Sequence, residues 1–202
     1  MTTTNVFAEL LIIGIETMGW IALLILSLFG YEWIDFSILN NLVIAIPLAA
    51  AAYVLGIMMD RLSDVLLAGA DHKIRQKVLG ERVAQSFPHL RIYILAKSPF
   101  LSTDLDYLRS RLRIMRSSLV NFGLLAITAA AFILSRAPIS LNAKFSAAAT
   151  AFLAGAVFAS LSFYAWRASS ITYYLRLQTA FALLPDDWRS QDNVSENAQS
   201  DE

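Results

Sequence analysis

Hydrophobic residues are gathered in four blocks that are separated by polar segments. A transmembrane helix needs roughly 20 predominantly apolar residues to cross about 30 Å of hydrocarbon. A soluble fold can bury one such helix, but not four, so the pattern predicts an all-α, polytopic membrane protein with four transmembrane helices. The blocks cover about 8–30, 42–59, 118–135 and 145–166.

Composition agrees with this pattern. The chain is 57% hydrophobic and only 16% charged, whereas soluble domains average roughly 45–50% and about 25%. The absence of cysteine excludes disulfides, thiolate metal sites and thiol nucleophiles. The sequence has no H-E-x-x-H, G-x-S-x-G or Walker-type glycine loop. We therefore favour a protein that is not an enzyme and expect no cofactor.

The charged residues predict the topology. Most of the chain's 16 Lys and Arg residues lie in segment 60–117, whereas the loop at 31–41 contains Glu32 and Asp35 and no basic residue. Cytoplasmic loops near span ends carry the excess of Lys and Arg, so segment 60–117 is predicted to be cytoplasmic. With four spans, the N- and C-termini then face the cytoplasm too, in a protein of the bacterial inner (plasma) membrane.

The polar segments still contain helical patterns. We expect residues 1–59 to hold the first two spans, 60–117 to form a small helical cytoplasmic cap, and 118–166 to hold the last two spans. The fourth span is predicted to continue as an exit helix over 167–186, whereas the polar, acidic tail at 187–202 is predicted to be disordered. The helix after the second span should stop near Phe87-Pro88, because the residue before proline disfavours the α region.

Small residues recur at helical spacing in two of the blocks. Helices in lipid associate where small residues let their backbones approach closely. We therefore predict that spans two and four pack tightly, either on each other or on a neighbouring subunit. The predicted packing faces are Ala45, Ala49, Ala52 and Gly56 in span two, and Ala147, Ala151, Gly155 and Ala159 in span four.

Two carboxylates follow the second block one helical turn apart. Asp60 and Asp64 could hold a divalent cation through oxygen ligands. With Gly56 they resemble the second half of the motif of CDP-alcohol phosphatidyltransferases, which implies a metal-dependent lipid-modifying enzyme of the membrane. The first half of that motif needs Asp-Gly followed by Ala-Arg, but the region before Gly56 reads NNLVIAIPL. His72 and His89 lie on either side of a break in the helix, so we do not expect a zinc site there.

Three arginines share a helix face just before the third block: Arg109, Arg113 and Arg116. Basic clusters beside a membrane attract anionic lipid by about 1 kcal/mol per residue. Nucleic-acid binding would need more aromatic side chains than lie nearby. We therefore predict contact with lipid headgroups and no nucleic-acid partner.

Glu16 places a carboxylate inside the first block. Counted from Glu9 at about 1.5 Å per residue, it lies about 10 Å into the membrane, where a charge costs roughly 2.5–3.5 kcal/mol on insertion scales. Three interpretations remain open: structural hydrogen bonding, the lining of a cation pore between subunits, and a proton relay. The same measure predicts a polar layer with one residue from each span: Glu16, Tyr53, Asn121 and Ser160.

Our first hypothesis is an inner-membrane protein that acts by forming a homo-oligomer, as a channel, a membrane effector or a sensor subunit, for example of a defence or stress system. The second is the lipid-modifying enzyme that would use Asp60 and Asp64. The third is a non-conducting scaffold whose cap docks a cytoplasmic protein partner, for which the aromatic stretch ITYYLRLQTAFALL (171–184) is a candidate.

Overall fold

The computed structural model describes residues 3–32, 42–80 and 99–182, and its regular structure over these ranges is entirely helical. Each of four helices is long and apolar enough to cross a membrane, which confirms the predicted all-helical fold with four candidate spans. The helices are α1 (Thr3–Phe29), α2 (Leu42–Leu79), α5 (Pro99–Arg136) and α6 (Leu141–Ala182).

Three of the helices extend well beyond their apolar blocks. α2, α5 and α6 have 38, 38 and 42 residues, about twice the length that a bilayer requires. α2 ends at Leu79, earlier than Phe87-Pro88, because Gly80 has a φ of 78° and its amide donates to the carbonyl of Gln76. A glycine in the left-handed conformation is a common helix stop. Residues 81–98, and with them the predicted stop, lie outside the described part.

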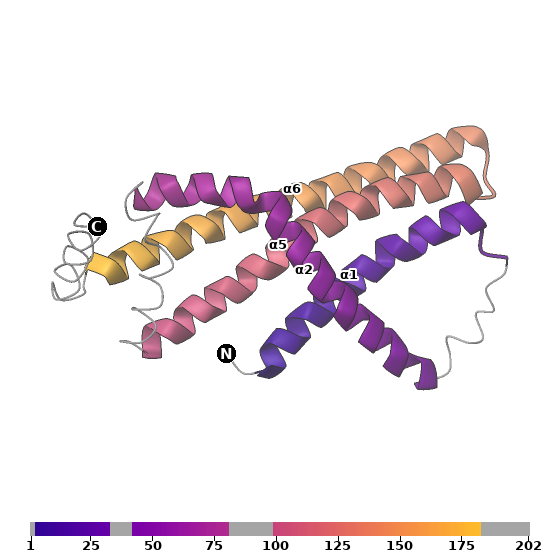
Figure 1. The fold of residues 1–202 in the computed structure, drawn as a ribbon. Coiled ribbons are helices and arrows are strands. Elements are labelled where there is room, and N and C mark those ends of the chain that lie inside the picture. Colours follow the sequence, from indigo (N-terminus) through magenta and orange to yellow (C-terminus); the bar gives the residue numbers. More distant parts are fainter. Residues whose placement is uncertain (1–2, 33–41, 81–98, 183–202) are drawn as a thin grey trace, which may run out of the picture.

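The helices run antiparallel, in alternating directions (Figure 1). α5 and α6 lie side by side and share the largest interface, and α1 packs on α5. α2 crosses α1. The first half of α2, before the crossing, diverges from the other three helices. The first residues of α1 and α5 and the last residues of α2 and α6 lie at the same end of the molecule, as expected for four consecutive crossings of one bilayer.

Within the small-residue faces of α2 and α6, the glycines make close approaches to the preceding helix. A Cβ atom on Gly56 would collide with the carbonyl of Leu10 in α1, and one on Gly155 would collide with Ala126 in α5. Consecutive helices usually pack as neighbours, which explains why each of these glycines meets the helix that precedes its own. The prediction that spans two and four pack on each other therefore does not describe the closest approaches within one chain.

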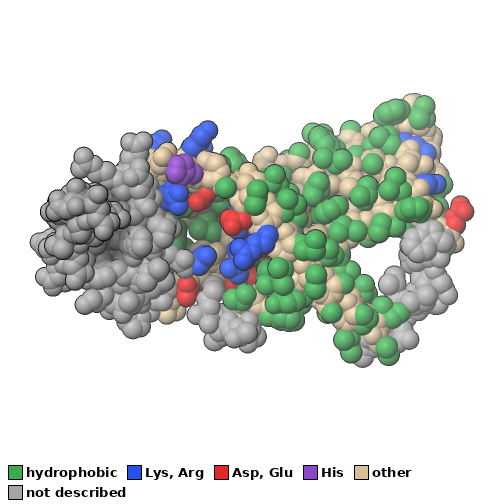
Figure 2. All heavy atoms as spheres, viewed as in Figure 1, with side chains coloured by type: hydrophobic (Ala, Val, Ile, Leu, Met, Phe, Trp, Pro, Cys, Tyr) green, Lys and Arg blue, Asp and Glu red, His purple; other side chains and the backbone are tan. Residues whose placement is uncertain are grey.

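The apolar part of the molecule presents hydrophobic side chains outward (Figure 2). Ile46 and Tyr164 are 76% and 74% exposed, an arrangement suited to lipid. Beyond it, α2 after Asp60, α5 before Ser117 and α6 after Trp166 form what we call the extension bundle. Its core contains Leu79, Leu105, Leu108, Tyr173, Tyr174, Leu177 and Ala180.

Candidate functional site

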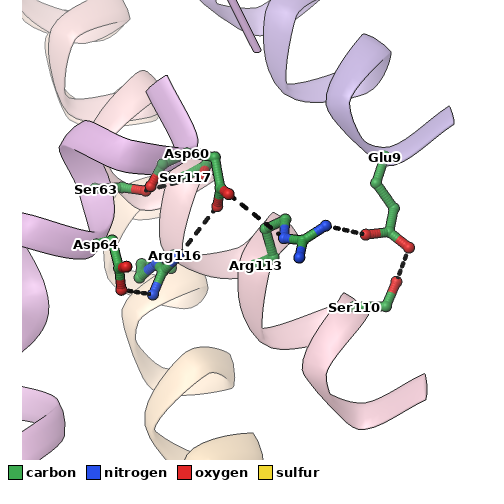
Figure 3. A network of polar contacts seen from close by, with 8 residues as sticks. All are labelled: Glu9, Asp60, Ser63, Asp64, Ser110, Arg113, Arg116 and Ser117. Carbon is green, nitrogen blue, oxygen red and sulfur yellow. Dashed lines mark hydrogen bonds and ion pairs between the residues drawn. The ribbon is translucent and has the colours of Figure 1, made fainter. Parts of the chain in front are cut away.

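Charged side chains connect α1, α2 and α5 where the apolar part of the molecule meets the extension bundle (Figure 3). Nη1 of Arg113 lies 3.3 Å from Oε2 of Glu9, and its Nε lies 3.5 Å from Oδ2 of Asp60. Nη2 of Arg116 lies 3.0 Å from the other oxygen of Asp60, and its Nη1 donates to Asp64. We call this row of five residues, Glu9–Arg113–Asp60–Arg116–Asp64, the ionic chain.

The ionic chain is largely shielded from solvent. Glu9 and Asp60 have side chains that are 7% and 17% exposed, whereas Asp64 at the outer end is 55% exposed. Hydroxyl groups add to the network: Ser110 donates to Glu9, and Ser63 and Ser117 are hydrogen-bonded at 3.0 Å. Partly buried charges need such partners, because desolvating them costs several kcal/mol per ion. The network therefore fixes three helices at one level.

A cavity of about 250 Å³ lies next to the ionic chain, between α2, α5 and α6. Asp60, Asp64, Arg113 and Arg116 line it together with Arg61 and Arg109. Trp166, Tyr173 and Tyr174 of α6 and Asp71 of α2 also line it. The hydroxyl of Tyr174 donates to Oδ2 of Asp71 at 2.7 Å. Burial, with a further contribution from Asp71, raises the pKa of Tyr174, so this phenol stays protonated and acts as a donor.

A second polar cluster lies deeper, between α1 and α5. Oγ of Ser118 lies 2.9 Å from both carboxylate oxygens of Glu16, and the amide of Asn121 donates to Glu16 at 3.2 Å. Oδ1 of Asn121 accepts hydrogen bonds from Thr17 at 3.2 Å and from Trp20 at 3.1 Å. The carboxylate inside the first span is thus hydrogen-bonded to α5 within one chain.

Only part of the predicted polar layer gathers in this cluster. Glu16 and Asn121 are in contact, whereas Tyr53 packs its ring on Phe7, with centroids 5.0 Å apart. Ser160 is exposed and donates to the carbonyl of Ala156 in its own helix. Ser160 was predicted to lie at the same level as Glu16, but its side chain is exposed on α6 and does not reach the cluster between α1 and α5.

Three further members of this cluster were not predicted from the sequence: Thr17, Trp20 and Ser118. Thr17 follows Ile13 by four residues in α1, and Trp20 follows Glu16 by four. In α5, Ser118 precedes Asn121 by three residues. Spacings of three and four place residues on one helix face. A search for polar residues at these spacings would have found the partners of Glu16.

The charged candidates have partners within the chain. Asp60 and Asp64 share Arg116 as a counter-ion, and the described residues contain no group of three or more His, Asp or Glu side chains suited to a metal. Arg113 and Arg116 point toward carboxylates, and Arg109 lines the cavity. Nδ1 of His72 contacts Arg75 at 2.8 Å, and His89 lies outside the described residues.

In the comparisons with known proteins, no family model, no curated protein and no solved structure matches this chain.

Proposed function

We propose that this protein is an integral membrane subunit that acts by assembling with copies of itself, as a channel, a membrane effector or a membrane sensor. The first half of α2 carries the proposal. Ala45 and Ala49 are exposed and, with Val43 and Ile46, line an apolar groove of about 480 Å³. Figure 1 shows this part of α2 diverging from the other helices.

Small residues support an assembly role for this groove. Ala52 and Gly56 continue the same helix face, and both are buried against α1. In a bilayer, van der Waals packing at small residues replaces the hydrophobic driving force. Half of the face is therefore used within the chain, and the exposed half is suited to a helix of a second copy.

The proposed setting is the inner membrane, with both termini in the cytoplasm. Arg116 and Arg136 lie roughly 20 residues apart on α5, a rise of about 30 Å that matches the hydrocarbon thickness. Among the described residues, most Lys and Arg side chains lie on the Arg116 side, and Arg136 and Lys144 lie at the other end. The positive-inside tendency favours that side as the cytoplasmic one.

Two alternative functions have less support. A metal-dependent lipid-modifying enzyme would need Asp60 and Asp64 as ligands, yet Arg116 contacts both carboxylates. A scaffold that docks a partner through residues 171–184 would need their apolar side chains, but Tyr173, Tyr174 and Leu177 are buried in the extension bundle.

Single cysteines test the assembly proposal in native membranes, because the chain has none of its own. Ala45→Cys should form a disulfide-linked dimer on mild oxidation. Leu153→Cys is the control, since Leu153 is 64% exposed on α6, away from the groove, and should stay monomeric. Efficient membrane insertion of Ala45→Cys without any cross-link would contradict the proposal. Conductance of reconstituted liposomes then separates a channel from an effector or sensor.

A further inference from the structure

The cavity between α2, α5 and α6 combines positive and negative side chains around one space. Arg61, Arg113 and Arg116 are among its cations, and Asp60, Asp64 and Asp71 are its carboxylates. The members of the ionic chain from α2 and α5 line it, and three aromatic residues of α6 line it as well. The carboxylates would repel a simple anion, and the arginines would repel a simple cation. The lining therefore favours a ligand that carries both charges.

Donor groups for an anionic part are present on one side. Arg116 lines the cavity and places one terminal nitrogen on Asp60 and the other on Asp64. A guanidinium has five N–H donors, so these two contacts leave further donors on its terminal nitrogens. Arg61 is exposed and lines the same cavity. Arginine is well suited to phosphate because its planar guanidinium offers several N–H donors.

Acceptor groups for a cationic part lie nearby. An ionised carboxylate has about four lone-pair sites. Asp71 accepts a hydrogen bond from Tyr174 on Oδ2, and Asp64 accepts one from Arg116 on Oδ1 while its side chain is 55% exposed. Both carboxylates can therefore accept further N–H donors from a ligand.

The cavity also lies at the depth of lipid headgroups in the proposed membrane setting. Arg116 is the last charged residue before the apolar part of α5, and Trp166 marks the corresponding level of α6. Tryptophan and arginine are both enriched at the membrane–water boundary. A phospholipid could thus place its headgroup in this cavity while its acyl chains stay in the bilayer.

We propose that this cavity binds a zwitterion composed of a phosphate and a primary ammonium, the chemistry of a phosphatidylethanolamine headgroup. The phosphate lies toward the guanidinium groups of Arg61 and Arg116, and the ammonium lies toward Asp64 and Asp71. This site is independent of the proposed assembly, because it is formed within one chain and on the side of α2 beyond Gly56.

Native mass spectrometry of the full chain in detergent tests the proposal with added phosphatidylethanolamine, phosphatidylcholine and phosphatidylglycerol of identical acyl chains. Phosphatidylethanolamine should bind about tenfold more tightly than phosphatidylcholine, whose trimethylammonium lacks N–H donors. Asp64→Asn should abolish this preference, and Arg61→Gln should weaken binding of all three phospholipids. Arg111→Gln is the matched control, since Arg111 is exposed on α5, packs on Tyr107 and does not line the cavity.

Soluble O-phosphoethanolamine distinguishes the sources of the ligand. Displacement of the lipid by this compound supports recognition of the headgroup chemistry, with a soluble source sufficient. Failure to displace it, with the lipid preference intact, supports a ligand that must also be anchored by its acyl chains. Equal binding of phosphatidylethanolamine and phosphatidylcholine, or an Asp64→Asn variant that keeps the preference, would overturn the proposal.

Discussion

Arg116 contacts Asp60 at 3.0 Å, although the two residues are 56 positions apart in the chain. The contact joins α2 to α5 (Figure 3), at the residues where the apolar block of each helix ends. Arg113 makes the equivalent connection between Asp60 and Glu9 of α1. Asp60 is thus the common carboxylate through which three helices are held at one level.

Replacement of Asp60 should therefore destabilise the protein. Asp60→Asn removes the charge that Arg113 and Arg116 share, at a site where all three side chains are about four-fifths buried. Breaking such a pair typically costs about 3 kcal/mol, measured as the free energy of unfolding in mixed micelles. Asp104→Asn is the control: its pair with Arg176 is more exposed, and surface pairs contribute about 0–1 kcal/mol. Equal losses in both variants would show that the ionic chain has no special role.

Glu16 should tolerate an amide but not an alkyl group. Glu16→Gln keeps an oxygen that accepts from Ser118 or Asn121 and should change the free energy of unfolding by less than about 1 kcal/mol. Glu16→Leu leaves these polar partners unsatisfied and should cost about 2–3 kcal/mol. If Glu16 serves only this structural purpose, Glu16→Gln also leaves ion and proton flux in liposomes unchanged. An altered flux with intact folding would instead favour the pore or relay interpretation.

The crossing of α1 and α2 predicts a strong effect at Gly56. Gly56→Ala introduces a methyl group where the backbone of Leu10 lies, so the helices must separate, and we expect a loss of about 1–3 kcal/mol. Gly69→Ala is the control within the same helix, because a Cβ there meets nothing within 4 Å. That substitution should be neutral or stabilising by up to about 1 kcal/mol, since alanine favours helix over glycine. A comparison of unfolding curves checks both values, and equal effects would contradict the close crossing.

The extension bundle predicts a contrast between two leucines of α6. Leu177 is 0% exposed and Leu175 is 49% exposed. Leu177→Ala should lower the free energy of unfolding by about 2–5 kcal/mol because it leaves a cavity in the core, whereas Leu175→Ala should lower it by less than about 1 kcal/mol. Chemical denaturation monitored by circular dichroism measures both. A larger loss at Leu175 would mean that this face of α6 packs on a partner.

The helical fold was predictable because span length and hydrophobicity are local properties of a sequence. The contact between Glu16 and Asn121 was predictable for the same reason, since the level of a residue along a helix follows from residue counting. The face on which a side chain lies was harder to predict. Ser160 shows this limit: it donates to its own helix, a local bond that serine makes readily.

The ionic chain was not recognised from the sequence, although its elements were visible. Asp60 and Asp64 are one turn apart, and so are Arg113 and Arg116. Two pairs of opposite charge, each spaced by about one turn and each beside an apolar block, indicate an interhelical network. Juxtamembrane arginines were instead interpreted through lipid attraction, because a single helix does not reveal which neighbour it faces.

The subunit number of the protein in lipid nanodiscs tests the proposed assembly most directly. Ala49 is exposed in the groove of α2, so Ala49→Leu should fill the groove without disturbing the fold of a single chain. Ala51→Leu adds the same bulk at an exposed position on another face of α2. The account predicts an oligomer for the wild-type chain and for Ala51→Leu, and a monomer for Ala49→Leu. A monomeric wild-type chain, or an Ala49→Leu variant with an unchanged subunit number, would contradict it.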